Sequence, residues 1–207
     1  MTTIARSLSL AAALAFAAPG LAQTKGPYEV KSGVYEQVDP LSKTTVYFDD
    51  YGLKQAEYGT TQFGPDDPAK HALKIRLPDG TMYDIDLDEK TGTSMKIDPK
   101  AAEALAAVMG PAMMKDTKTT DLPSRQILGK SCAGKEITVA SMRMTTRTWT
   151  WKGILLRSEM VSAGTNPVTG KAAAPMVIEV STLNVGPVPA EKLQVPAGVK
   201  IQNLSGK

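Results

Sequence analysis

Alternation of apolar and polar side chains is the clearest pattern along the chain. Leu73, Ile75 and Leu77 alternate with two basic residues, and residues 83–88 alternate apolar side chains with aspartates. A period of two is typical of a strand with one buried and one solvated face. The turn sequence Pro-Asp-Gly separates the two runs, so the pattern predicts a β-hairpin over residues 73–87.

Strands are also predicted on both sides of this hairpin. Residues 44–60 are typical of a second hairpin around the turn sequence DDYG, and residues 28–38 of an exposed strand. Further strands are expected at 124–129, 135–144, 146–151, 154–161 and 174–185, with a turn region at 130–134. The proline-rich tail is expected to form an irregular edge segment with one short strand.

One segment has a clear helical pattern. Asp98-Pro99 supplies an N-cap and a first-turn proline, and the strong helix formers of residues 100–109 end at Gly110-Pro111. A second short turn is expected through residues 113–114. Many hairpin strands with one inserted helix predict an α+β, mainly β fold, in which a long curved antiparallel sheet (a half-barrel) wraps around one or two helices.

The N-terminal residues 1–22 have the layout of a secretory signal peptide. Arg6 supplies the positive start, residues 8–18 form an apolar run, and small residues follow where a signal peptidase cleaves. We therefore expect a soluble periplasmic protein with a single domain over residues 24–207. No cysteine lies near the cleavage site, so no lipid anchor is expected, and no later segment is long and apolar enough to span a bilayer.

Charge and the scarcity of reactive residues narrow the function classes. Without Arg6 the chain has 23 Lys and Arg against 21 Asp and Glu, with no dense basic block, so no nucleic-acid partner is expected. His71 is the only histidine and Cys132 the only cysteine. These residues form no catalytic constellation and no usual metal cluster, which indicates a non-enzymatic protein without a cofactor. The oligomeric state is left open.

Two patterns leave metal binding as a weaker alternative. Asp84, Asp86 and Asp88 have the 1-3-5 spacing of a calcium loop, but Glu89 stands where such a loop needs glycine. Three aspartates on the solvated face of a strand explain the same spacing. Nine methionines remain after the signal peptide, and thioether clusters such as the one around Met142 can hold Cu(I) or simply fill irregular core space.

The only two tryptophans lie in one predicted hairpin, TRTWTWKGILLRSEMV. With a two-residue turn at Lys-Gly, Trp151 faces Ile154 and Trp149 faces Leu156, so that all four share one apolar face. The opposite face is then polar and solvated. Its residues are Thr146, Thr148, Thr150, Arg157 and Glu159, with Leu155 as the apolar exception. The apolar face either lines a cleft between sheet and helix or packs against the helix.

Several stretches resemble uncharacterised exported bacterial proteins that share the architecture of the lipoprotein-carrier (LolA/LolB-like) superfamily. They are VYFDDYG (46–52), YDIDLDEKTGTSM (83–95), ILGKSCAGKEI (127–137), WKGILLRSE (151–159) and VPAEKLQVPAGVKI (188–201). In that fold the concave face of the sheet and its helices enclose an apolar cavity for acyl chains. The resemblance implies that the tryptophan hairpin lies on or near such a cavity, although this chain offers fewer helices than the carriers use.

The sequence therefore predicts a periplasmic binding protein for a lipid, an acylated protein or another amphiphile. The candidate ligand-binding residues are Trp149, Trp151, Ile154, Leu156, Met109 and Met113. An envelope scaffold or interaction protein with a filled core is the alternative from another class.

Overall fold

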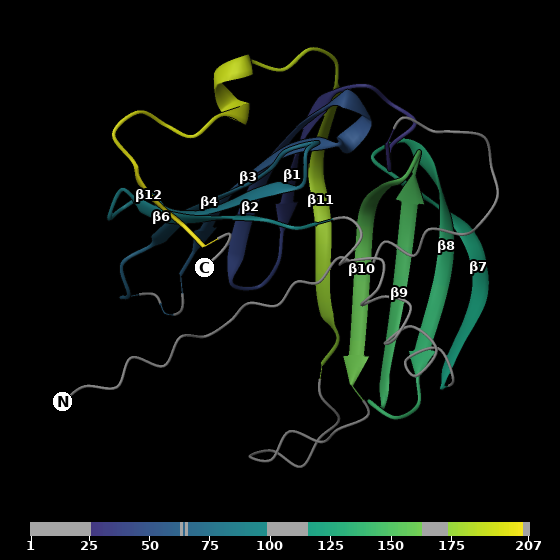
Figure 1. Cartoon of the computed structure of the whole chain (residues 1–207). Coiled ribbons are helices and arrows are strands. Elements are labelled where there is room, and N and C mark those ends of the chain that lie inside the picture. Colours follow the sequence, from purple (N-terminus) through teal and green to yellow (C-terminus); the bar gives the residue numbers. More distant parts are fainter. Residues whose placement is uncertain (1–25, 63, 65, 99–115, 163–173, 205–207) are drawn as a thin grey trace.

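The computed structural model describes residues 26–62, 64, 66–98, 116–162 and 174–204. They form one sheet of 12 strands in the order β12-β6-β5-β4-β3-β2-β1-β11-β10-β9-β8-β7 (Figure 1). The strands are β1 (Gly33–Val38), β2 (Ser42–Asp49), β3 (Lys54–Thr61), β4 (Lys70–Arg76), β5 (Thr81–Asp86), β6 (Thr91–Lys96), β7 (Thr117–Ile127), β8 (Lys130–Val139), β9 (Met144–Trp151), β10 (Ile154–Ser162), β11 (Met176–Val185) and β12 (Lys200–Asn203). Two short 3-10 helices, η1 (Asp50–Gly52) and η2 (Ala190–Leu193), complete the described elements.

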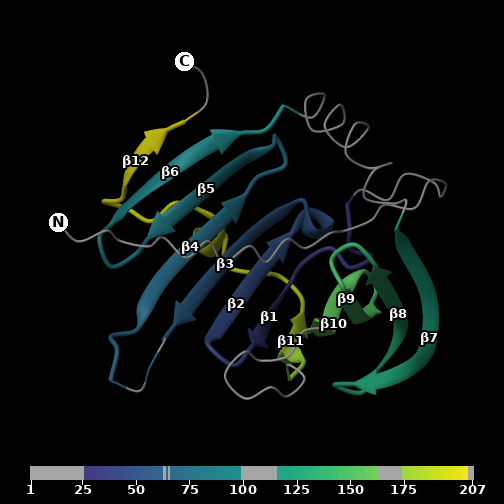
Figure 2. The same cartoon turned by 90° about the horizontal axis from the view of Figure 1, so that it is seen from below.

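The curved, mainly β fold expected from the sequence is confirmed. The sheet bends between its two halves, with β12 and β7 at its open edges (Figure 2). Its strands pair antiparallel except that β12 runs parallel to β6, which makes the sheet mixed rather than wholly antiparallel. The predicted signal peptide (1–22) and the predicted helical region (99–114, with Met109 and Met113) lie outside the described residues. In the described part of the chain, no helix has the length and apolar character needed to cross a membrane.

The position of β1 differs from the prediction of an exposed strand. β1 lies in the middle of the sheet, between β2 and β11, and Tyr35 is buried there. Gly33 is required at this position, because a Cβ atom would lie 2.6 Å from the Asn184 carbonyl oxygen and 2.8 Å from the Phe48 ring. A glycine in a strand interior often marks such a close approach of neighbouring chain.

Two-residue turns join β7 to β8 and β9 to β10. The expected turn at Lys152-Gly153 is confirmed, with φ values of 49° and 80°. The predicted turn region at 130–134 is wrong: the chain turns at Leu128-Gly129, with φ values of 50° and 68°, and β8 starts at once. Positive φ at both central residues gives the hairpin turn whose twist matches that of the strands.

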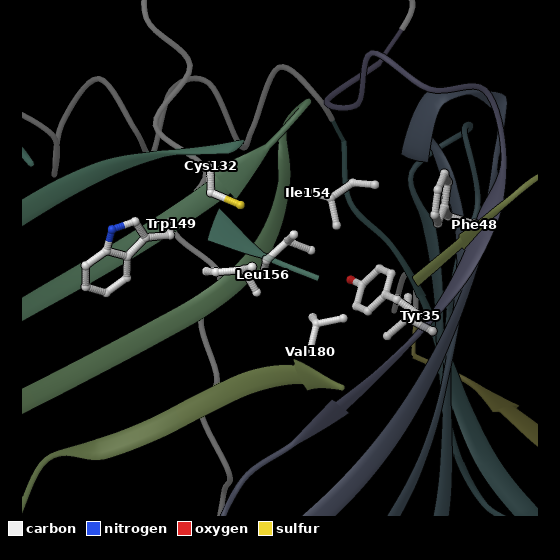
Figure 3. Packing of buried hydrophobic residues seen from close by; sticks show 9 residues of the cluster. Tyr35, Phe48, Cys132, Trp149, Ile154, Leu156 and Val180 are labelled. Carbon is white, nitrogen blue, oxygen red and sulfur yellow. The ribbon is translucent and has the colours of Figure 1, made fainter. Parts of the chain in front are cut away.

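Apolar side chains gather on both faces of the sheet. The inner cluster fills the inside of the bend, where side chains of β1 and β2 meet those of β8, β9 and β10 (Figure 3). It consists of Tyr35, Val46, Phe48, Ile127, Cys132, Trp149, Ile154, Leu156 and Val180. The outer cluster consists of Ala56, Leu73, Ile75, Ile85 and Leu193. Since Phe48 pairs with Gln55 and the adjacent Tyr47 pairs with Ala56, the two clusters lie on opposite faces.

Each cluster is closed by a segment outside the sheet. Leu193 of η2 and the neighbouring C-terminal residues cover the outer cluster. At the end of the inner cluster, the Tyr28 N–H donates to the Tyr51 carbonyl (2.9 Å) and the Glu29 N–H to the Lys152 carbonyl (3.1 Å). The Tyr28 ring meets Phe48 edge to face, with centroids 4.9 Å apart. The segment before β1 thus ties the two halves of the sheet together across the bend.

Candidate ligand-binding face

The tryptophan hairpin forms as predicted at its turn and differs further along. Trp151 pairs with Ile154, as expected, but Trp149 pairs with Arg157 instead of Leu156. The reason is a β-bulge between Leu155 and Arg157, which places one extra residue on β10. Leu156 still belongs to the inner cluster together with Trp149.

Arg157 and Glu159 were expected on the solvated face, and this prediction is wrong because of the bulge. Arg157 pairs with Trp149, and Glu159 pairs with Arg147 of the same β9 face. Both side chains are only 18% exposed. A bulge changes the side-chain alternation for every residue after it, and the local sequence pattern cannot show this.

These residues belong to an arginine–glutamate network that crosses five strands. Its members are Arg125, Arg147, Arg157, Glu136, Glu159 and Glu179. Arg157 Nε donates to Glu159 Oε1 at 2.8 Å, and the same guanidinium pairs with Glu179. Arg147 Nε donates to Glu136 Oε2 at 2.7 Å, a bond that raises the pKa of Arg147. The sequence signal for this network was a set of opposite charges on neighbouring strands, which only the correct register brings together.

Arg125 connects the network to the inner cluster. Its guanidinium lies 5.4 Å from the Trp149 ring centroid, and its Nη1 lies 3.6 Å from Glu159 Oε1. The indole rests over Gly134, where a Cβ atom would lie 2.8 Å from Trp149 Nε1. Trp149 is therefore held between a glycine and an arginine, at the border between apolar and charged side chains.

The apolar end of this face is tightly packed. Ile154, Leu156 and Cys132 have no exposed surface and Trp149 is 8% exposed, whereas Trp151 is half-buried. Burial raises the pKa of the Cys132 thiol, which favours the neutral, unreactive form. His71 lies in β4, in the other half of the sheet, with its Nδ1 atom 2.8 Å from Asp88 Oδ1.

The aspartate motif has a structural explanation. Asp86 Oδ1 accepts hydrogen bonds from the N–H groups of Asp88 and Glu89, as expected for an aspartate at a turn. Asp88 accepts one from the His71 N–H at 2.9 Å. Within the described ranges, no three His, Cys, Asp or Glu side chains are grouped closely enough to hold a metal ion.

A small pocket of about 220 Å³ lies on the outer face, against the segment that follows η2. It is lined by Lys54, Ile75, Leu77, Tyr83, Leu193, Gln194 and Val195. Of the predicted ligand-binding residues, the four that the structure describes (Trp149, Trp151, Ile154 and Leu156) do not line it. Sequence reasoning missed it because its walls come from segments more than a hundred residues apart. It is smaller than the usual ligand site of roughly 300–1,000 Å³.

Comparison with known proteins adds evidence on the fold alone. No protein-family profile and no curated protein matches the chain. An uncharacterised conserved protein from Thermus thermophilus is similar in structure, with a TM-score of 0.55 and 6% identity over 84% of this chain and 91% of that one. A MucA/MucB complex structure from Pseudomonas aeruginosa gives a TM-score of 0.44 at 15% identity. The match covers 80% of this chain but only 55% of that chain. A DUF1329 family protein from Desulfovibrio piger gives a TM-score of 0.28 at 13% identity, over 79% and 90% of the two chains.

Proposed function

We propose that the protein is a non-enzymatic periplasmic binding protein of the lipoprotein-carrier type that holds an amphiphile on the inner face of β8–β10. The observation that carries this proposal is the polarity gradient along these strands. On β9 the tryptophans are followed back along the strand by Arg147, and on β10 Leu156 is followed by Arg157 and Glu159. An amphiphile has the same two parts, an apolar tail and a polar head.

The two parts of the face offer different interactions. Each CH₂ of a tail moved from water onto the apolar end contributes roughly 0.8 kcal/mol. The network has three arginines and three glutamates, so its charges balance, which suits a zwitterionic or hydroxylated head better than a strongly charged one. The stretches that resemble the lipoprotein carriers, WKGILLRSE among them, include part of this face.

A scaffold or interaction protein with a filled core is the second candidate. The specific observation in its favour is the complete burial of Ile154, Leu156 and Cys132. In this case the inner cluster only holds the bend of the sheet, and no lipid enters it.

Native mass spectrometry of protein taken from the periplasm without detergent separates the two candidates. An amphiphile-binding protein is expected to carry an additional mass and to show quenching of tryptophan fluorescence by a brominated fatty acid. An unliganded mass with no quenching would contradict the amphiphile proposal and leave the scaffold as the better explanation.

A matched pair of leucine variants locates the site. Leu156 and Leu73 are both fully buried, one in the inner and one in the outer cluster. Leu156→Ala and Leu73→Ala are each expected to lower the free energy of unfolding by about 2–5 kcal/mol. Only Leu156→Ala is expected to lose the additional mass and the quenching. Equal binding by both variants would contradict the assignment to the inner face.

A further inference from the structure

Two lysines lie against the half-buried Trp151 at one end of the sheet. Lys130 Nζ is 4.7 Å and Lys152 Nζ is 5.2 Å from the centroid of the Trp151 ring. Cation–π attraction holds an ammonium group at such a distance. One indole therefore positions two positive charges.

The turns of two neighbouring hairpins bring these lysines together. Lys152 is the first residue of the β9–β10 turn, and Lys130 starts β8 directly after the Leu128-Gly129 turn. Because β8 and β9 pair antiparallel, the start of β8 lies beside the end of β9 (Figure 1). Both lysine positions are thus fixed by short turns on a sheet.

The charge balance here differs from that of the inner face. Each arginine of the network pairs with a glutamate, but no ion pair in the described part of the chain includes Lys130 or Lys152. Since each ammonium group lies about 5 Å from the same ring, the two are at most about 10 Å apart and repel each other. An anion that both flexible lysine side chains can reach relieves this repulsion.

We propose that Lys130, Lys152 and Trp151 form a binding site for a phosphate group. A phosphate has several acceptor oxygens and accepts charge-assisted hydrogen bonds from both ammonium groups at once, whereas a carboxylate has two oxygens. Leu128, at the tip of the adjacent turn, is 44% exposed and provides apolar contact for the chain of a phospholipid. The site lies at the end of the strands and shares Trp151 with the face proposed for the amphiphile, but its two lysines are not part of that face, so variants of the lysines test it separately.

The two indole N–H signals in a ¹H–¹⁵N NMR spectrum test the site directly. The chain has two tryptophans, and Trp151→Phe assigns their signals. Inorganic phosphate is titrated at ionic strength kept constant with sodium chloride. The Trp151 signal is expected to shift in a saturable way, while the signal of the buried Trp149 stays in place. If no saturable shift appears, the site does not bind free phosphate. Only binding to phospholipid vesicles that depends on Lys130 and Lys152 can then support it.

Paired lysine variants distinguish a site from general positive charge. Lys130→Met with Lys152→Met keeps the apolar stems on the indole and is expected to weaken phosphate binding at least tenfold. Lys118→Met with Lys135→Met removes two charges from exposed positions on β7 and β8 and is expected to leave the affinity unchanged. Equal weakening by both double variants would overturn the proposal. Lys130→Arg with Lys152→Arg keeps the charges and is expected to retain binding.

Vesicle flotation identifies the source of the phosphate. Binding to phosphatidylglycerol vesicles that is lost with Lys130→Met and Lys152→Met, and kept in the Lys118 and Lys135 control, supports a lipid headgroup. A saturable phosphate shift without vesicle binding supports a soluble phosphate compound. If neither inorganic phosphate nor vesicles bind in a way that depends on Lys130 and Lys152, the proposed site is wrong.

Discussion

Tyr28 and Tyr35 show how single residues of the inner cluster respond to pH. Both rings pack against Phe48, with centroids 4.9 and 6.3 Å from it. Burial raises the pKa of both tyrosines above its ordinary value, because a buried phenolate loses its hydration. Neither residue was singled out by the sequence, since tyrosines in strands are common on half-buried surfaces.

The raised pKa values predict a loss of stability in alkali. Below pH 10 both tyrosines are neutral in the folded and unfolded chains. As the pH rises above 10, the unfolded chain releases these protons first, so the free energy of unfolding falls until the folded pKa values are passed. Urea unfolding between pH 8 and pH 11 is expected to show this fall, and Tyr35→Phe to make it shallower. The same slope in the variant and the wild type would contradict the assignment to these tyrosines.

At the scale of elements, the sequence predicted strands well and their register less well. The alternation of Leu73, Ile75 and Leu77 with polar residues correctly predicted the β4–β5 hairpin, because each strand has one buried face. The alternation could not show the bulge at Leu155–Arg157, since a bulge is defined by the partner strand. The sequence therefore brought together the apolar residues of this face, Trp149, Ile154 and Leu156, and missed the charged residues beside them.

Gly134 gives a test of how the β8–β9 pair holds Trp149. In Gly134→Ala the new methyl group meets Trp149 Nε1 at 2.8 Å and Leu122 Cβ at 2.9 Å, so the strands or the indole must shift. We expect a loss of about 1–3 kcal/mol in the free energy of unfolding. Gly59→Ala is the matched control in β3, because its Cβ meets only the Thr44 hydroxyl at 3.7 Å. Equal losses measured by urea unfolding would show that Trp149 is not held by this contact.

At the scale of the whole molecule, the C-terminal segment covers the outer cluster and so keeps it from water. The sequence predicted an irregular tail with one short edge strand, and β12 is that strand. Its parallel pairing with β6 was not predictable, because it joins segments about a hundred residues apart and no local pattern encodes the pairing. Leu193 is 3% exposed and closes the outer cluster.

Removing the Leu193 side chain is expected to open the outer cluster. Leu193→Ala leaves a cavity over Ile75 and Ile85, and such truncations cost about 2–5 kcal/mol. Leu204→Ala, at a position 53% exposed, is expected to be neutral. Thermal unfolding of the two variants checks this. If Leu193→Ala leaves the melting temperature unchanged, Leu193 does not stabilise the packing of the C-terminal segment on the sheet.

The central position of β1 has a consequence for the order of folding. β1 is the first strand along the described residues, but one of its two neighbours is β11, the last strand but one. The two halves of the sheet therefore join only when almost the whole chain is present, and pairing of such distant segments is slow. During synthesis β1 therefore lacks its β11 partner until late, and the two halves of the sheet stay separate until then.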